Sequence, residues 1–159
     1  MRFSKKSEYA LRALLELTQS YGQRPVRRSD IAERQQIPIG FLESILLQLK
    51  NAGFLASRSG LDGGFWLIKK PEQISLGSII RALDGPLAPI PCVSQTAFQT
   101  CEDCPYANEA QCPIKVPMLE VRNAISGVLD HWTLREFAGR MSCGSNVIKK
   151  SKKKEVIHT

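Results

Sequence analysis

The sequence contains no run of about 18 apolar residues, the length that a helix needs to cross a bilayer, so a transmembrane span is excluded. Its opening resembles a signal peptide, but Glu8, Arg12 and Glu16 interrupt the apolar stretch and no small-residue cleavage site follows. We therefore expect a mature, cytoplasmic N-terminus. A glycine-rich nucleotide loop and a catalytic dyad are also missing, and His131 and His158 are isolated. These absences argue against an enzyme.

Positive charge is abundant but unevenly distributed. The 159 residues carry a formal net charge of +7, and 43% of them are apolar, which is enough for a packed core. Residues 1–70 contain 12 Lys and Arg against 6 Asp and Glu, residues 71–145 contain 5 against 8, and residues 146–159 contain 5 against 1. This asymmetry favours a polyanion-binding module joined to a module with another role, although a solvated basic surface would have the same composition.

The first half of the chain has the pattern of a helix-turn-helix. Apolar spacing predicts a helix over 4–21, capped by Ser4 or Ser7, and a short helix over 30–35 with Ser29 as its N-cap. Pro38 ends that segment, and a second helix is expected from about 39 to 51. Its predicted buried stripe consists of Leu42, Ile45, Leu46 and Leu49.

A hairpin follows the helix-turn-helix. Glycines in "GLDGG" (60–64) supply the backbone freedom of a tight turn, and 65–68 have the composition of a returning strand. A helix-turn-helix followed by a hairpin is a winged helix, a fold that binds DNA in most cases and protein in others. A further helix is predicted over 75–84, and prolines then mark a boundary.

A long helix with a regular apolar seam is predicted near the C-terminus. We expect the seam to pair with the same helix of a second subunit, the alternative being that it packs on its own winged helix. Thr133 is expected to cap a final turn over 134–140, and the basic end of the chain to be disordered. The seam residues are Ile114, Met118, Val121, Ile125, Val128 and Trp132.

The fold class that these elements predict is mainly α with a small β-hairpin wing. The expected divisions are a winged helix-turn-helix domain (1–85), a cysteine-rich loop (86–113), a dimerisation helix with its final turn (114–140) and a basic tail (141–159).

Four of the five cysteines lie in the predicted loop, with the spacing C-x8-C-x2-C-x7-C: Cys92, Cys101, Cys104 and Cys112. In a reducing compartment such clustering favours metal binding or redox chemistry over structural disulfides. From the spacing alone an iron–sulfur cluster, a zinc site, a redox disulfide and unliganded thiols all remain open. The fifth cysteine, Cys143, lies in the tail, where we expect an unliganded thiol.

In combination these segments resemble the Rrf-type winged-helix transcription regulators, the family of IscR, NsrR and CymR. The resemblance covers roughly residues 1–138. It implies a homodimer that binds double-stranded DNA at an imperfect palindrome, with the second helix of the helix-turn-helix in the major groove and the wing at the minor groove. Several members hold an iron–sulfur cluster in the loop corresponding to 92–112, and others hold none. The resemblance is carried by "MRFSKKSEYALRALLEL", "DIAERQQIPIGFLESILLQLKNAGFL", "GGFWL", "SLGSIIRALDG" and "LDHWTLREF".

The side chains opposite the buried stripe of the reading helix are the candidates for contact with bases. They are Gly40, Phe41, Glu43, Ser44 and Gln48. Glu43 can accept a hydrogen bond from a cytosine amino group, or can pair with a nearby Lys or Arg; the resemblance favours base reading. The candidates for phosphate contacts are Arg27, Arg28, Ser29, Lys50 and Arg58.

Two positions depart from the pattern of the family. Ser59 stands where many relatives have an arginine before the wing glycine, which puts minor-groove readout by the wing in doubt, although Arg58 can still reach a phosphate. Lys115 stands where IscR-like members have a histidine ligand. We therefore expect the four loop cysteines to hold the cluster, with 2Fe-2S slightly favoured over 4Fe-4S. Glu8, at the place of an acidic ligand in some relatives, is a further candidate, and zinc is the alternative metal.

Overall fold

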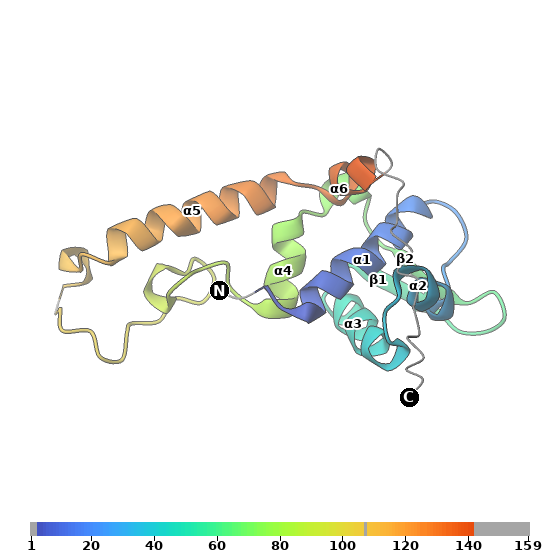
Figure 1. The fold of residues 1–159 in the computed structure, drawn as a ribbon, viewed down its shortest axis with the longest axis horizontal. Helices are drawn as coiled ribbons and strands as arrows, with labels where there is room; N and C mark the ends of the chain where they lie inside the picture. Colours follow the sequence, from blue (N-terminus) through green and yellow to red (C-terminus); the bar gives the residue numbers. More distant parts are fainter. Residues whose placement is uncertain (1–2, 107, 142–159) are drawn as a thin grey trace, which may run out of the picture.

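The computed structural model describes residues 3–106 and 108–141. The tail and Cys143 lie outside this range. Within it the chain is mainly helical with one two-stranded antiparallel sheet, which confirms the predicted fold class (Figure 1). The helices are α1 (Lys5–Gln19), α2 (Arg28–Gln35), α3 (Ile39–Asn51), α4 (Leu76–Asp84), α5 (Lys115–His131) and α6 (Leu134–Met141). The strands are β1 (Leu55–Arg58) and β2 (Gly64–Leu67), and short 3₁₀ turns are η1 (Pro71–Gln73), η2 (Pro91–Val93) and η3 (Glu109–Gln111).

Helix α1 forms the centre of the winged helix-turn-helix body. Its N-cap is Ser4, whose Oγ accepts from the backbone N–H of Ser7 at 3.1 Å, so Ser4 and not Ser7 is the cap. The helix stops at Gln19, two residues before its predicted end, and Tyr21 lies beyond it and is exposed. The buried apolar face of α1 packs against α3, α4 and α6.

Helices α2 and α3 form the predicted helix-turn-helix. The turn uses Gln36 in the left-handed region (φ 51°, ψ 48°), the one non-glycine residue with positive φ among the described residues. The start of α2 differs from the prediction: the helix begins at Arg28 and its N-cap is Arg27, with no side-chain cap, so Ser29 lies inside the first turn. In α3 the predicted stripe of Leu42, Ile45, Leu46 and Leu49 is fully buried.

The hairpin is the predicted wing. β1 and β2 pair antiparallel, with Leu55 opposite Leu67 and Arg58 opposite Gly64. Val26 makes two backbone hydrogen bonds with Phe65, at 3.0 and 2.9 Å, and thereby ties the start of the helix-turn-helix to the wing. A Cβ at Gly64 would lie 2.5 Å from the Val26 carbonyl oxygen, so this close approach requires glycine.

Helix α5 extends away from this body and crosses α4, while α6 folds back onto α1 (Figure 1). Thr133 caps α6 as predicted: its Oγ1 accepts from the N–H of Glu136 at 3.2 Å, and its own N–H donates to the Glu136 carboxylate at 2.9 Å. The loop between α4 and α5 lies under α5 and contains the four clustered cysteines. Of the helices described, none is long and apolar enough to cross a membrane.

Candidate functional site

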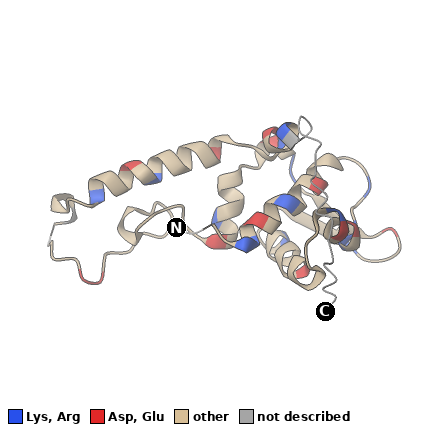
Figure 2. Cartoon of the chain, in the orientation of Figure 1, with Lys and Arg blue, Asp and Glu red and all other residues tan. Residues whose placement is uncertain are grey.

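The predicted site residues separate into two regions at opposite ends of the molecule (Figure 1). The residues predicted to contact DNA lie on α2, α3 and the wing. The cysteines lie beneath the far end of α5. In Figure 2 the backbone of the helix-turn-helix body is coloured at Lys and Arg positions, and the loop between α4 and α5 contains none. The two ends therefore differ in charge as well as in position.

Helix α3 presents the predicted reading face to solvent. Because its buried leucines and isoleucine occupy one side, the opposite side is free over its whole length. Phe41 is fixed from behind by Tyr9 of α1, whose ring meets it edge to face with centroids 5.7 Å apart. The exposed residues of this face include every predicted one: Gly40, Phe41, Glu43, Ser44 and Gln48.

Glu43 forms an ion pair with Arg28 of α2. The sequence analysis left two roles open for Glu43, pairing with a nearby basic residue and contact with a base. The structure, which contains no DNA, shows the first of these. Both side chains are about half exposed, so the pair is accessible and its net stabilisation is small. The pair brings one predicted phosphate contact and one predicted base contact together across the helix-turn-helix.

Four predicted phosphate-contacting residues line a single cavity of about 600 Å³ between α2 and the wing. They are Arg27, Arg28, Ser29 and Arg58. The fifth, Lys50, does not line it but donates from Nζ to Ser57 Oγ of β1 at 2.9 Å, close to the same region. This clustering of cations at exposed positions suits a polyanion that passes between the helix-turn-helix and the wing.

Residues that the sequence analysis did not single out complete this region. Arg24 lines an adjoining cavity of about 450 Å³ together with Arg27 and Arg58. Arg24 lies close to the "PVRR" run, so the local density of arginine was a usable signal. Ser57 and Ser59 also line the larger cavity, but isolated serines give no signal in sequence.

The four clustered cysteines line one cavity of about 370 Å³. Cys92 is buried in η2, Cys101 is exposed, and Cys104 and Cys112 are half-buried; all four are free thiols. The other lining residues are Ile90, Thr100, Tyr106, Ile114 and Lys115. Of these, Ile114 was predicted only as part of the apolar seam, and Lys115 only as the residue that replaces a histidine ligand. The cavity thus brings together the four predicted ligands with an apolar wall and one lysine.

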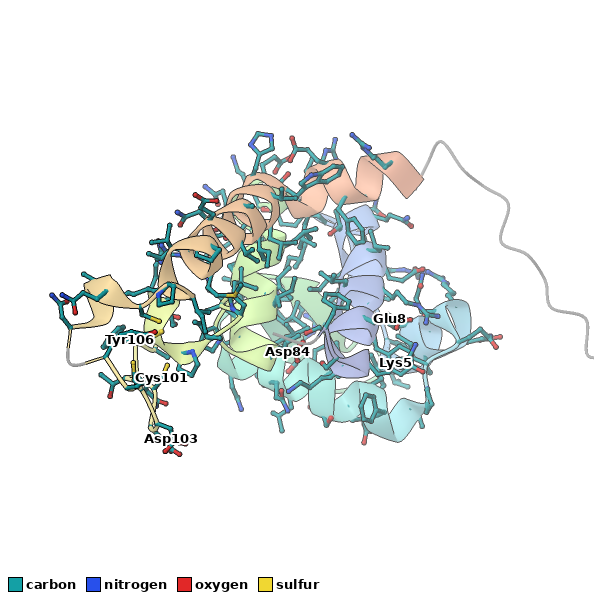
Figure 3. The ribbon with its side chains drawn as sticks, turned by 60° about the vertical axis from the view of Figure 1, so that its left-hand side comes forward. Lys5, Glu8, Asp84, Cys101, Asp103 and Tyr106 are labelled. Atoms are coloured by element: carbon teal, nitrogen blue, oxygen red, sulfur yellow. The ribbon has the colours of Figure 1, made fainter. Side chains whose placement is uncertain are left out.

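The thiols are close enough to influence each other. Hydrogen bonding with Cys92 is the main cause of a raised pKa of Cys101, and desolvation and the charges of the neighbouring cysteines act in the same direction. Cys104 Sγ also donates to the Tyr106 carbonyl oxygen at 3.8 Å. Figure 3 shows Cys101 and Tyr106 together in the loop below α5. The raised pKa means that Cys101 favours its protonated thiol form in this cavity.

In the described part of the chain, no three His, Cys, Asp or Glu side chains converge in an arrangement ready to hold a metal ion. The chemistry of the donors nevertheless suits an iron–sulfur cluster or zinc, because four thiolates are the ligand set of both. The residues at this cavity therefore fit such a group by type, and the loop would have to draw its thiols together to bind it.

Glu8 does not join the cysteines within one chain. It pairs with Lys5 at 2.6 Å and with Arg12 at 3.9 Å on α1. The hydrogen bond from Lys5 lowers the pKa of Glu8. Figure 3 shows Glu8 and Cys101 well separated.

The predicted seam of α5 is divided between two environments. Ile114, Val121 and Val128 are 57%, 41% and 58% exposed. Met118, Ile125 and Trp132 are half-buried against the chain itself, and the guanidinium of Arg140 stacks 4.4 Å from the centre of the Trp132 ring. No residue of α5 is fully buried. Within one chain the helix therefore retains an uncovered apolar edge.

One ion pair and one glycine fix α5 on α4. Arg81 and Asp130 form a bidentate pair with N–O distances of 2.5 and 2.8 Å, which lowers the pKa of Asp130. A Cβ on Gly77 would lie 2.0 Å from Asp130 Oδ1, so a side chain there would have to displace the Asp130 carboxylate from Arg81. Through α4 and α1, the position of α5 is thus connected to the helix-turn-helix.

Comparison with known proteins places the chain among transcription regulators. Residues 3–140 match the Rrf2 family model, described as an iron-dependent transcriptional regulator. An rrf2-like protein of Rhodobacter capsulatus is 40% identical over 136 residues, which cover 84% of this chain and 89% of that protein. The structure of CymR, the global cysteine regulator of Bacillus subtilis, matches with a TM-score of 0.71 and 30% identity over 88% of this chain and 98% of that one. The structure of T. potens IscR matches with a TM-score of 0.67 and 28% identity, covering 89% and 88%.

Proposed function

The chain belongs to the Rrf2 family of transcription regulators, and from this premise we propose that it is a homodimeric operator-binding protein whose affinity for DNA is modulated by an iron–sulfur cluster held in the cysteine loop. The observation that carries the proposal is the meeting of four thiols in one cavity next to the start of α5. The family model itself is described as iron-dependent, which supports the same reading.

DNA binding is assigned to the basic end of the molecule. Helix α3 enters the major groove with its exposed face, and the cations around the cavity between α2 and the wing contact phosphates on either side. Glu43 leaves Arg28 when DNA is bound: Arg28 then contacts phosphate, and the freed carboxylate accepts from a cytosine amino group. The Glu43–Arg28 ion pair is thus replaced by one contact with phosphate and one with a base. Because the contact with the base depends on sequence, this face is suited to specific recognition and not only to electrostatic attraction of DNA.

Dimer formation is assigned to the uncovered edge of α5. Ile114, Val121 and Val128 recur every seven residues, the repeat that allows two helices to pack along a common seam. Two chains joined in this way would place two copies of α3 on an imperfect palindrome.

Cys92, Cys101, Cys104 and Cys112 would hold the cluster, which supplies a centre sensitive to iron supply and to oxidants. Residues of the chain itself would couple the loop to the DNA-binding body. The backbone N–H of Lys115, the first residue of α5, donates to the Cys112 carbonyl at 3.2 Å. Ordering the loop therefore acts directly on the start of α5, and the Arg81–Asp130 pair transmits the position of α5 to the body. The expected result is a change in the spacing of the two reading helices.

A thiol switch, or a zinc site, is the second candidate. The thiol switch is favoured by the meeting of four free thiols in one cavity, where Cys92 lies near enough to Cys101 to raise its pKa. Among the relatives are CymR, the global cysteine regulator of B. subtilis, and CymR of Staphylococcus aureus, which has been solved in an oxidized form.

Purification without oxygen, followed by iron, sulfide and zinc analysis, separates these candidates. The proposal predicts a coloured protein with iron and acid-labile sulfide, and loss of both when Cys92, Cys101, Cys104 or Cys112 is changed to Ser. Cys143→Ser is the matched control, and it should retain iron.

Operator selection with the loaded and the metal-free protein, side by side, tests the regulatory part of the proposal. We expect a palindromic site whose affinity differs between the two forms by tenfold or more, in line with coupling free energies of about 1–3 kcal/mol. A colourless protein with zinc, or equal affinities of the two forms, would favour the second candidate or a plain DNA-binding protein.

A further inference from the structure

The tip of the wing presents an apolar side chain. Leu61 is 87% exposed, more than any other exposed large apolar residue described. Single exposed leucines are common on protein surfaces and mean little by themselves. The backbone that carries this one is what distinguishes it.

The wing tip is held in one shape by glycines and arginines. The N–H of Gly63 donates to the Gly60 carbonyl at 3.0 Å, which closes a tight turn with Leu61 and Asp62 at its corner. A Cβ at Gly63 would lie 2.3 Å from the Arg58 carbonyl oxygen, so the turn tolerates no side chain there. The corner is therefore narrow, and its two side chains are those of Leu61 and Asp62.

Two arginines support this corner from the body. Arg27, at the N-cap of α2, donates to the Leu61 carbonyl, and Arg58 of β1 donates to the Asp62 carbonyl at 3.1 Å. Arg58 would have to release the wing in order to extend beyond its tip. The guanidinium groups of both residues therefore lie below the tip, where they can contact phosphates, and Leu61 projects past them.

The surroundings indicate what the tip meets. Arg27 and Arg58 line both the cavity of about 600 Å³ and that of about 450 Å³, and Arg24 lines the second. Arginines gathered around the base of a narrow projection can contact the phosphate backbones that border a DNA groove. The tip itself carries the apolar Leu61 beside the carboxylate of Asp62. Of these two side chains Leu61 suits the minor groove, where leucine is among the side chains that proteins insert.

We propose that Leu61 enters the minor groove beside each half-site and selects A·T over G·C pairs by shape. The minor-groove edge of a G·C pair carries the guanine 2-amino group, which A·T pairs lack. An apolar side chain would leave that donor without a partner, whereas the floor of an A·T pair lets it approach closely. This inference rests on the DNA-binding part of the proposed function and is independent of any cluster.

Operators in which single base pairs flanking the half-sites are replaced test the inference. An inosine·cytosine pair lacks the 2-amino group, so its minor-groove edge resembles that of A·T while its major-groove edge resembles that of G·C. At the pair that the wing contacts, the wild-type protein should bind A·T and inosine·cytosine operators alike, and the G·C operator roughly tenfold more weakly.

Leu61→Ala should weaken binding to the A·T operator by roughly tenfold, because apolar contact area is lost, and should bind all three operators alike. Leu61→Arg should bind the A·T operator more tightly than Leu61→Ala does. Its affinity should depend more steeply on salt, and the slope of log K against log salt should increase by about one unit for each wing that gains a phosphate contact. Ile68→Ala, a change at an apolar residue just after the wing that is 53% exposed, is the matched control and should leave affinity and base preference unchanged. Thermal melts followed by circular dichroism verify that each variant is folded.

Leu61→Ala protein that binds with wild-type affinity, or that still distinguishes G·C from inosine·cytosine, would overturn the inference. A wild-type protein that binds no operator would overturn it together with the proposed function. DNA binding that is indifferent to the cluster would contradict the proposed sensor alone and leave the assignment of Leu61 intact.

Discussion

The winged helix-turn-helix body and the cysteine arm are stabilised in different ways. In the body, long apolar side chains from α1, α3 and α4 are fully buried around a single core. In the arm, which consists of the loop from Gly85 to Ile114 and of α5, the helix has no fully buried residue and contacts the body mainly through α4. Burial of apolar surface within one chain therefore stabilises the body. The arm, by contrast, has an exposed apolar edge and an open cavity lined by thiols.

The charges of the two regions follow the same division. Residues 1–70 have a net charge of +6 (12 against 6), whereas residues 71–145 have −3 (5 against 8). The basic region presents its exposed helix face on elements that pack around a buried core, which suits the DNA reading that we propose for it. The comparison teaches that the region proposed to read DNA has its core complete within one chain, whereas the region proposed to sense has an apolar edge and a thiol cavity that are left open.

The largest effect should come from truncating a body residue. Leu46→Ala removes a fully buried side chain of α3 and should lower the free energy of unfolding by about 3 kcal/mol. Val116→Ala, at a residue of α5 that is 58% exposed and lies outside the predicted seam, should change it by less than about 0.5 kcal/mol. Urea denaturation of both variants measures the contrast. Comparable losses would show that the arm is as much a part of the cooperative core as α3 is.

An intermediate effect is expected where the arm meets the body. Gly77→Ala places a Cβ on Asp130 Oδ1 and displaces it from Arg81, whereas Gly139→Ala in α6 meets nothing within 4 Å. Both changes gain about 1 kcal/mol of helix propensity, so the difference between them isolates the helix contact. Gly139→Ala should be the more stable variant by about 1–2 kcal/mol. Equal stabilities in chemical denaturation would mean that α5 is not held on α4 by this contact.

The smallest effect should be a dependence of folding stability on pH that arises from Asp84 in the body. Burial opposes ionisation of Asp84, but two hydrogen bonds from Ser4, at 3.1 and 2.5 Å, outweigh it and hold the pKa of Asp84 below its ordinary value. A carboxyl with a lowered pKa stabilises the folded state above its ordinary pKa of about 4 and loses that contribution as pH falls through its folded value.

Asp84→Asn should therefore cost less than about 1 kcal/mol at pH 7, after allowance for solvent screening, and almost nothing near pH 2. Denaturation curves at several pH values measure this. Asp103→Asn, at an exposed carboxyl of the arm, is the control and should be neutral throughout. An Asp84→Asn deficit that persists in acid would mean that the carboxylate charge is not the source of the stabilisation.

Much of the body could be predicted from the sequence because its signals are local. The bounds of α3 and its four buried residues follow from apolar spacing and from Pro38. The start of α2 was predicted wrongly, since Ser29 has the chemistry of a cap but Val26, held by Phe65 of the wing, sets where the chain turns. A cap preference of about 1 kcal/mol yields to such a tertiary contact.

Local patterns in the sequence determined three features by themselves. Apolar periodicity gave the helices, glycines and prolines gave the wing and the boundaries, and cysteine spacing gave the candidate ligands. Each of these signals acts over a few neighbouring residues. Only the tertiary structure decided that Arg28 pairs with Glu43, that two arginines support the corner at Leu61, and which edge of α5 remains open. Those outcomes depend on side chains from segments distant in sequence. A pairing of that kind is fixed by where the packed core places each segment, and no local pattern records it.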